Sequence, residues 1–268
     1  MHPILFEIGD FPVYTYGVLL AAAYLLGLQF ALVRARRLGL DPNRIMDLGI
    51  WVIVSALVGA KLLLLVVEWD TYGRSTSALL TLIRSAGVFY GGLILAVVVA
   101  IWYMWRHRLP IWSVSDAFAP GIALGHVVGR MGCFFAGCCF GRQTSVPWAI
   151  TFHDESAARN VGTPLNVPLH PAQLYEAGAE LLILGVLLIA ERRGRQFPGR
   201  TFWGYMLLYG ISRFIVEFYR GDSRGMVGMF STSQFVSLLI VPISIVMLMV
   251  LARRPGPAPT AAAARRAA

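Results

Sequence analysis

The sequence contains few charged residues for its length. Asp, Glu, Lys and Arg make up 14% of the 268 residues, whereas hydrophobic residues make up 57%. A soluble domain usually carries roughly 25% charged residues, and the mean hydropathy here is +0.66. The low charge and the long apolar runs disfavour an ordinary soluble domain and favour a chain whose main solvent is lipid.

The signals of several other protein classes are also missing. Residues 1–17 have no basic start, carry two carboxylates and are interrupted by two prolines, so we expect no cleavable signal peptide there. The formal charge of +9 does not form a stripe that binds nucleic acid, because the basic residues lie in short clusters at the ends of apolar segments. No internal repeat is visible, which disfavours a secondary transporter.

Apolar segments long enough to cross a membrane recur along the chain. At about 1.5 Å rise per residue, a helix of about 20 residues crosses a hydrocarbon core about 30 Å thick. The segments are residues 14–33, 47–67, 88–105, 113–130, 172–190, 201–218 and 230–252. The sequence therefore predicts an all-α polytopic membrane protein of about seven transmembrane helices, with residues 1–252 as a single domain.

The arginines predict the orientation of this domain. They crowd the ends that follow the first, third, fifth and seventh segments, and they are sparse in the alternate loops. The crowded ends hold Arg34, Arg36, Arg37, Arg44, Arg106, Arg108, Arg192, Arg193, Arg195, Arg200, Arg253, Arg254, Arg265 and Arg266, and the sparse loops hold Arg74, Arg84, Arg142, Arg159, Arg220 and Arg224. The crowded side should be cytoplasmic, which places the N-terminus outside, the C-terminus inside and an odd number of crossings between them.

Two segments outside the apolar spans follow from this orientation. Residues 131–171 are expected to form a small extracytoplasmic cap, with Trp148 and Phe152 available to pack it. Residues 253–268 are rich in Pro, Ala and Arg and are expected to form a disordered basic tail held near the anionic cytoplasmic leaflet.

Among the ionisable residues inside the apolar segments, five are singled out as candidates for function. A charge in the bilayer centre costs from a few to more than about ten kcal/mol, so such residues are rare without a role. They are Lys61, Asp116, Arg130, Arg213 and Glu217. For each of them, the structural alternative is an ion pair that ties two helices together.

Arg130 stands at the start of a glycine-rich segment, residues 129–141. Gly132, Gly137 and Gly141 are expected to break the helix and to bring backbone N–H groups close to whatever Arg130 binds. A planar guanidinium beside backbone donors suits a phosphate group. The segment therefore predicts a phosphate-binding site at membrane depth.

A second candidate segment covers residues 209–220. Tyr209, Arg213 and Glu217 are spaced four apart and share one helical face, which Arg220 is expected to extend toward the outer surface. An i,i+4 bridge from Glu217 would neutralise Arg213 for burial or orient its guanidinium, and both readings can hold together.

Polar residues also open the fifth apolar segment. His170 precedes Pro171, and Gln173, Tyr175 and Glu176 occupy the first turns of the expected helix. Because this end should lie at the outer interface, we expect His170 and Gln173 to bind a lipid headgroup, with a helix cap as the alternative role of His170.

The three cysteines lie within seven residues of one another. Cys133, Cys138 and Cys139 could be joined by a histidine such as His126, His153 or His170 in a zinc site. We nevertheless expect no metal, because adjacent cysteines rarely chelate one ion well and no second C-x2-C pair exists. A thiol-disulfide centre is an alternative, since the segment should face an oxidising compartment. Packing of small side chains between glycines is the simplest reading.

Six separated motifs together resemble the prolipoprotein diacylglyceryl transferases. They appear in the order of the family and cover most of the chain from about residue 14 to 225. They are Tyr16-Gly17, Phe89-Tyr90-Gly91-Gly92-Leu93-Ile94, Ser115-Asp116, the Gly-Arg-x-Gly-x-Phe run around Arg130, the His-Pro-x-Gln-Leu-Tyr-Glu run from His170, and Arg213-Phe214-Ile215-Val216-Glu217-Phe218-Tyr219-Arg220.

The resemblance implies a seven-helix enzyme of the bacterial inner membrane. Such enzymes move the diacylglyceryl group of phosphatidylglycerol to the lipobox cysteine of a prolipoprotein signal peptide, and they release glycerol 1-phosphate. The resemblance carries the family's arginines to Arg130 and Arg213 and its first-span tyrosine to Tyr16, and it requires no cofactor. Nucleic acid is not an expected partner.

The sequence departs from the family pattern at two places. Tyr90 stands where the family often has a histidine that has been proposed as the base, and a phenol ordinarily titrates near pH 10. As a catalytic candidate, Tyr90 would hydrogen-bond the substrate, or the thiol would be deprotonated elsewhere, for instance in the field of the arginines. Cys133, expected to bind substrate together with Gly132, stands where asparagine is common, which fits a divergent branch. Two other functions remain as alternatives, a membrane thiol-disulfide enzyme that uses the three cysteines and a phospholipid or anion transporter.

Overall fold

The computed structural model describes residues 3–9, 11–73, 75–84, 87–193, 196–222 and 225–254. In these ranges the chain forms β1 (Ile4–Ile8), β2 (Phe11–Tyr14), α1 (Thr15–Arg37), α2 (Pro42–Val67), α3 (Trp69–Tyr72), α4 (Thr76–Arg84), α5 (Phe89–Arg106), α6 (Ile111–Ala136), β3 (Ile150–Thr151), α7 (Glu155–Val161), β4 (Pro168–Leu169), α8 (Ala172–Glu191), α9 (Arg200–Val216), the 3-10 turn η1 (Glu217–Tyr219), β5 (Met226–Val227), β6 (Phe230–Ser231) and α10 (Thr232–Arg253). The expected tail from 255 to 268, and Arg74, Arg195 and Arg224 of the orientation argument, lie outside the described residues.

Every apolar segment of the sequence corresponds to a helix. Among the described residues, α1, α2, α5, α6, α8 and α10 are long and apolar enough to cross a membrane. The prediction of an all-α polytopic membrane protein is therefore confirmed. Helix α9 has 17 residues and continues into η1, so its crossing as a seventh span stays a prediction.

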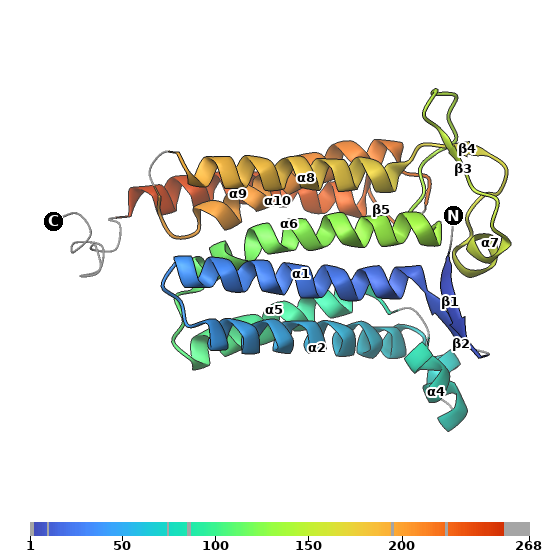
Figure 1. The fold of residues 1–268 in the computed structure, drawn as a ribbon, viewed down its shortest axis with the longest axis horizontal. Helices are drawn as coiled ribbons and strands as arrows, with labels where there is room; N and C mark the ends of the chain where they lie inside the picture. Colours follow the sequence, from blue (N-terminus) through green and yellow to red (C-terminus); the bar gives the residue numbers. More distant parts are fainter. Residues whose placement is uncertain are drawn as a thin grey trace. The chain divides into compact units, whose positions relative to one another are not determined.

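The chain divides into two compact units. The first consists of Met1–Gly27 and Phe118–Ala268, and the second consists of Leu28–Ala117. Helices α8, α9 and α10 lie side by side in the first unit (Figure 1), with α9 against both of the others. The second unit is built on α2 packed against α5.

Glycines set the distance between α1 and α6 within the first unit. A Cβ on Gly27 would lie 2.8 Å from the carbonyl oxygen of Gly121, and one on Gly125 would lie 3.0 Å from that of Ala23. Close approach of backbones at small residues is the usual means by which membrane helices pack. The pair therefore holds the start of α1 beside the part of α6 that leads to Arg130.

The cap on the first unit is smaller than the sequence predicts. Helix α6 continues through Ala136, so residues 131–136 belong to the helix. The remainder contains α7 and a two-stranded ribbon in which β3 pairs antiparallel with β4. Phe152 is 1% exposed and packs the cap as expected, but Trp148 is 60% exposed. Its expected core role is wrong, because its indole Nε1 instead donates to the Tyr175 hydroxyl at 2.7 Å.

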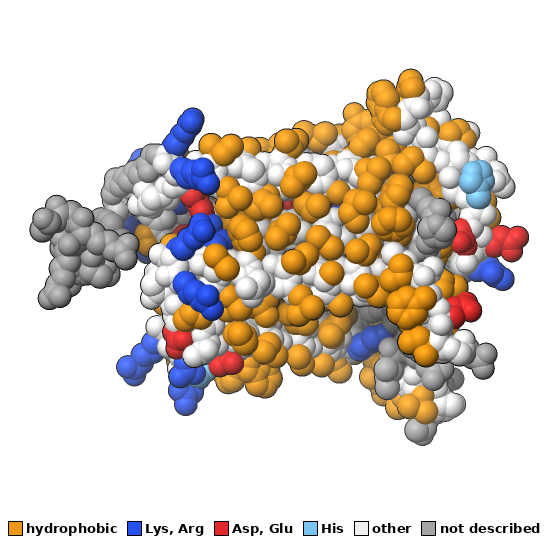
Figure 2. All heavy atoms as spheres, in the orientation of Figure 1, with side chains coloured by type: hydrophobic (Ala, Val, Ile, Leu, Met, Phe, Trp, Pro, Cys, Tyr) orange, Lys and Arg blue, Asp and Glu red, His pale blue; other side chains and the backbone are white. Residues whose placement is uncertain are grey.

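The surface of α8 has the pattern of a helix in lipid. Hydrophobic side chains cover its side and basic side chains gather at the end where the helix finishes (Figure 2). The large exposed hydrophobic residues are Leu181, Leu182, Val186 and Ile189, and Arg192 and Arg193 follow at the end. The sequence argument for orientation rests on this grouping of arginines at helix ends.

The second unit holds the other ionisable candidates. Lys61 of α2 donates to the Leu82 carbonyl oxygen at 2.9 Å. Arg34, 6% exposed, donates through Nη2 to the Asp116 carbonyl oxygen at 3.2 Å. These contacts join separate helices, but both acceptors are backbone carbonyl oxygens and not the carboxylates of the expected ion pairs. Tyr90, at the start of α5, also belongs to this unit and is 42% exposed.

Candidate functional site

Three arginines and one glutamate meet at the core of the first unit. Arg130 comes from α6, Glu176 from the first turns of α8 and Arg213 from the last turn of α9, and Arg220 follows η1. We call these four residues the arginine cluster. The two arginines that the sequence singles out, Arg130 and Arg213, therefore lie at one site.

The Glu176 carboxylate is shared by all three guanidinium groups. Arg130 Nη2 lies 2.5 Å from Glu176 Oε2, and Arg213 Nη1 lies 3.3 Å from Oε1. Arg220 Nη1 also contacts Oε1. A guanidinium–carboxylate contact is a charge-assisted hydrogen bond, roughly twice as strong as a neutral one. One side chain thus fixes the relative positions of three cations.

Two of the arginines have a further carboxylate of their own. Arg213 Nη2 lies 2.5 Å from Glu217 Oε2, which is the i,i+4 bridge expected from the sequence. Arg220 donates to both carboxylate oxygens of Asp222, at 2.9 and 2.8 Å. Among the described residues, Arg130 has only the shared Glu176 as a carboxylate partner. Its charge is therefore the least neutralised of the three.

A histidine connects Arg130 to a second glutamate of α8. Arg130 Nε donates to His126 Nε2 at 3.1 Å, which leaves the proton of a neutral imidazole on Nδ1. His126 Nδ1 lies 2.8 Å from Glu180 Oε1. Glu180 thus orients the His126 imidazole, and the imidazole in turn orients the Arg130 guanidinium.

The arginine cluster is almost completely enclosed by protein. Side-chain exposure is 13% for Arg130, 7% for Arg213, 2% for Arg220 and 4% for Glu176. Removing unpaired charges from water costs several kcal/mol per ion, and close partners with good geometry offset that cost. The structure thus gathers these charged side chains at one buried place, and Arg130 is the most accessible of them.

The helix break expected in the glycine-rich segment occurs later than predicted. Gly132 lies inside α6, where a backbone N–H bonds to the carbonyl four residues earlier. The expectation that Gly132 offers a backbone donor is therefore wrong. The helix ends before Gly137, which adopts a left-handed φ of 78°. The flanking apolar residues outweigh the roughly 1 kcal/mol that a glycine costs inside a helix.

Gly141 joins the cap to the segment that carries Arg220. Its N–H donates to the His170 carbonyl at 3.1 Å, and the neighbouring Arg142 N–H donates to the Tyr219 carbonyl at 2.8 Å. A Cβ on Gly141 would contact backbone oxygens of both His170 and Tyr219. Only a glycine fits between these two backbone segments. Their connection holds Arg220 in place.

The expected headgroup ligands His170 and Gln173 make hydrogen bonds within the protein. Gln173 is fully buried, and its amide nitrogen donates to the Cys138 carbonyl at 2.8 Å. His170 Nδ1 lies 3.1 Å from the Tyr175 hydroxyl, and its ring packs edge-on against Tyr219. In this structure both residues brace the loop and the cap.

The tyrosines of the sequence prediction divide between the two units. Tyr16 lies beside Gly132, since a Cβ on that glycine would be 3.3 Å from the Tyr16 ring. Tyr209 packs against the His126 imidazole, with ring centroids 5.7 Å apart. Tyr209 therefore borders the histidine that bonds Arg130, Tyr16 lies beside the last turns of α6, and Tyr90 belongs to the second unit.

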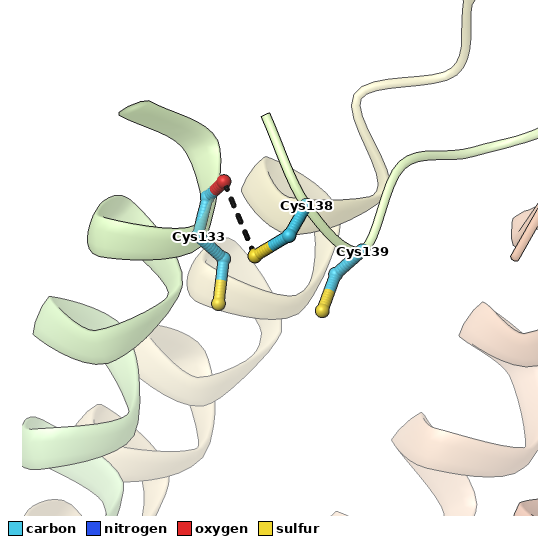
Figure 3. Close-up of side chains that lie close together, drawn as sticks. All are labelled: Cys133, Cys138 and Cys139. Atoms are coloured by element: carbon cyan, nitrogen blue, oxygen red, sulfur yellow. Dashed lines mark hydrogen bonds between the residues drawn. The ribbon is translucent and has the colours of Figure 1, made fainter. Parts of the chain in front are cut away.

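The three cysteines form a compact group at the end of α6. Their sulfur atoms all lie within 4.8 Å of one another (Figure 3), and all three are present as thiols. Cys138 Sγ lies 3.7 Å from the Cys133 carbonyl oxygen. Hydrogen bonds with Cys133 and Cys138, followed by the charges of Arg130 and Arg220, lower the pKa of the Cys139 thiol.

Sequence reasoning did not identify Glu176 and Glu180 as the centre of the site. The available signal was a pair of matching spacings: Glu176 and Glu180 are four apart on α8, and His126 and Arg130 are four apart on α6. Residues four apart share a helix face, so two carboxylates on one apolar helix suit two basic groups on another. Ser233, which accepts from Arg213 Nη2 at 2.9 Å, gave no such signal.

Comparison with known proteins finds one family over nearly the whole chain. Residues 3–250 match the family model of prolipoprotein diacylglyceryl transferase. The phosphatidylglycerol–prolipoprotein diacylglyceryl transferase of Clostridium tetani is 34% identical over 245 residues, which cover 91% of this chain and 96% of the relative. The corresponding transferase of Finegoldia magna is 32% identical over 248 residues, which cover 92% and 94%. The chain therefore belongs to the prolipoprotein diacylglyceryl transferase family.

Proposed function

We propose that this protein transfers the diacylglyceryl group of phosphatidylglycerol to the lipobox cysteine thiol of prolipoproteins, the first step of bacterial lipoprotein maturation. The observation that carries the proposal is the arginine cluster, a buried cationic site on lipid-crossing helices. The names of the similar proteins from Clostridium tetani and Finegoldia magna support the substrate pair.

Arg130 is the residue best suited to bind the phosphate of the lipid. It is the most accessible of the three arginines, and its one carboxylate partner is shared with the other two. A guanidinium has five N–H groups, of which Arg130 uses Nε on His126 and Nη2 on Glu176. The remaining N–H groups can reach phosphate oxygens without breaking the cluster.

Arg213 and Arg220 are assigned to the departing glycerol phosphate. The lipobox thiolate attacks C3 of the diacylglyceryl group, a C–S bond forms and the C3–O bond breaks, and its electron pair goes to the phosphate oxygen. Negative charge therefore grows on glycerol 1-phosphate in the transition state. Fixed guanidinium groups stabilise such charge, and removing one donor of this kind typically lowers kcat about 10²–10³-fold.

The thiol proton must leave before or during the attack, because the thiolate is the nucleophile. Tyr90 stands where the family often has the histidine proposed as the base, and we assign it a hydrogen bond to the substrate. The positive field of the arginines favours the thiolate, so the proton can pass to solvent. Tyr16, beside Gly132, is assigned to positioning the lipid.

Both substrates stay in the membrane, so they must enter and leave between helices. We place the protein in the bacterial inner membrane with its N-terminus outside and its C-terminus in the cytoplasm, because arginines gather at the helix ends that would face the cytoplasm. The arginine cluster then lies toward the outer leaflet, where the lipobox cysteine emerges.

Purified protein in phosphatidylglycerol vesicles with a lipobox peptide tests the proposal directly. Wild-type protein should add the diacylglyceryl mass to the peptide and release glycerol phosphate, and Arg130→Ala and Arg213→Ala should not. Arg193→Ala is the matched control, since Arg193 is exposed at the end of α8. Expression in a strain depleted of its own transferase should restore lipidation of a reporter lipoprotein.

The same assay separates the two alternative functions. Movement of phosphatidylglycerol across vesicles with no change in peptide mass would support a transporter and contradict the transferase. Loss of all activity only on replacing the three cysteines, with Arg130→Ala active, would support a thiol-disulfide enzyme.

A further inference from the structure

The chain places all its cysteines at one point beside the arginine cluster. Cys133 is in the last turns of α6, and Cys138 and Cys139 are in the loop that follows. The chain has three cysteines in total, so their sulfur atoms, within 4.8 Å of one another, account for every thiol of the protein. The transfer reaction proposed above assigns no role to them.

The spacing of the sulfur atoms is close to the spacing of thiolate ligands on one metal ion. A metal–sulfur bond of about 2.3 Å places two sulfurs on one ion about 3.8–4.0 Å apart in tetrahedral or trigonal geometry. The observed limit of 4.8 Å lies less than about 1 Å above this value. Rotation of the side chains is enough to close that difference.

The sequence argument against a metal was that adjacent cysteines chelate one ion poorly. Successive side chains normally diverge, but Cys139 has a left-handed φ of 61°. This uncommon conformation for a residue with a Cβ directs its thiol to the same side as that of Cys138 (Figure 3). The backbone conformation of Cys139 thus allows the two adjacent cysteines to face one ion.

The loop is held in this shape by buried contacts. Gln173 donates to the Cys138 carbonyl at 2.8 Å, and the Thr163 hydroxyl donates to the Gly137 carbonyl at 2.9 Å. A Cβ on Gly137 would lie 2.8 Å from the Ala157 side chain in the cap. The cap therefore braces the loop before any ligand arrives, as a preorganised site requires.

We propose that Cys133, Cys138 and Cys139 bind one soft d10 cation, Cu(I) or Zn²⁺, as a three-thiolate site. On binding, three S–H bonds break, three metal–sulfur bonds form and three protons leave to solvent, with no change in oxidation state. Thiolates select soft ions over Mg²⁺ and Ca²⁺, which take oxygen ligands. Arg130 lies one turn before Cys133 on α6, and Gly141, two residues after Cys139, pairs with Arg220. The charge of these two arginines offsets the excess negative charge of three thiolates.

The test uses the full-length protein, purified in detergent without oxygen. Titration with Cu(I) under a competing chelator, with Zn²⁺ and with Mg²⁺ should give one equivalent of Cu(I) or Zn²⁺ and no Mg²⁺, with a sulfur-to-metal charge-transfer band. Cys133→Ser, Cys138→Ser and Cys139→Ser should each weaken binding at least about 10-fold, by analogy with the 10–100-fold losses seen on altering metal-site partners. His153→Gln is the control, and it should bind like wild type because His153 bonds Asn166 in the cap.

A second measurement needs only wild-type protein, in case a serine variant does not fold. Maleimide should label three thiols in the metal-free protein and none when the ion is bound. Three labels in the presence of both ions would overturn the proposal, as would binding that survives all three serine substitutions. Fewer than three free thiols in metal-free protein that is denatured before labelling would indicate a disulfide, which would also overturn the proposal, since two of the ligands would be lost.

Discussion

Glu176 holds together three cations that would otherwise repel one another. Its two oxygens contact Arg130, Arg213 and Arg220, and it is 3% exposed. In a buried site, removing one partner of an ion pair costs about 3–5 kcal/mol because the other charge is left uncompensated. The carboxylate should therefore matter more for stability than any single arginine.

Replacement of this carboxylate by an amide tests that role. Glu176→Gln keeps the shape but removes the shared charge, so we expect a lower midpoint of thermal unfolding in detergent. Inorganic phosphate should then raise the midpoint of the variant more than that of wild type, since an anion can replace the lost charge. The exposed Glu155→Gln serves as the control. An unchanged midpoint would show that the cluster does not depend on Glu176.

Arg130 provides a second prediction at the scale of single residues. Arg130→Lys keeps the charge, but lysine lacks the planar donors that bind a phosphate from two sides. We expect kcat/KM for peptide lipidation to fall roughly 10²-fold or more, while Arg193→Lys stays at the wild-type value. Equal activity of Arg130→Lys and wild type would rule out bidentate phosphate binding by this residue.

These residues show which contacts of the site can be predicted from the sequence. Arg130 and Arg213 could be identified because a charge in an apolar segment is conspicuous, and the Arg213–Glu217 bridge follows from helical spacing. The contact of one carboxylate, Glu176, with all three arginines could not be predicted, because it depends on how α6, α8 and α9 pack.

At the scale of elements, the site depends on where helices end. The sequence predicts one continuous helical face from Tyr209 to Arg220. The structure instead ends α9 at Val216 and adds the turn η1. Arg220 then lies in extended backbone and still reaches Glu176. The sequence singles out Arg220, but its position beside Glu176 depends on the connection to Gly141.

The connection at Gly141 predicts the effect of adding one methyl group at that position. A Cβ on Gly141 would contact backbone oxygens of His170 and Tyr219, neither of which is a flexible side-chain end. Gly141→Ala should therefore shift the segment that carries Arg220 and lower lipidation activity by about 10-fold or more, since small displacements of positioned groups are costly.

A glycine in an open position provides the comparison. Apart from the backbone of α8 itself, no atom of the described residues lies within 4 Å of a Cβ placed on Gly178. Gly178→Ala should keep wild-type activity and stability, because alanine favours a helix by up to about 1 kcal/mol. If Gly141→Ala behaved in the same way, the connection would not hold Arg220.

At the scale of the whole molecule, the arrangement in the membrane is the main prediction from composition. The helices match the apolar segments closely, because length and hydropathy alone decide which segments a bilayer accepts. The hairpin of β1 with β2 and the short helices α3 and α4 have no such signal, and the sequence did not predict them.

Labelling from the two sides of the membrane tests the orientation. With the native cysteines replaced by serine, Val161→Cys in the cap should react with a membrane-impermeant maleimide in intact cells. Arg193→Cys at the end of α8 should react only after permeabilisation. Both residues are exposed, so access to the reagent depends on the side alone. The reverse pattern would place the N-terminus in the cytoplasm.

The short length of α9 has a consequence for the lipid around it. Its 17 residues span about 26 Å, a few ångströms less than the usual hydrocarbon thickness of about 30 Å. Ile211 and Ile215 are 43% and 52% exposed, so the predicted crossing of α9 would bring these side chains into contact with acyl chains. A bilayer adapts to such a mismatch by thinning, which would draw headgroups inward at the end that carries Arg213. Turnover should therefore be faster in vesicles of shorter-chain phosphatidylglycerol. A rate that does not depend on chain length would exclude this local thinning of the bilayer.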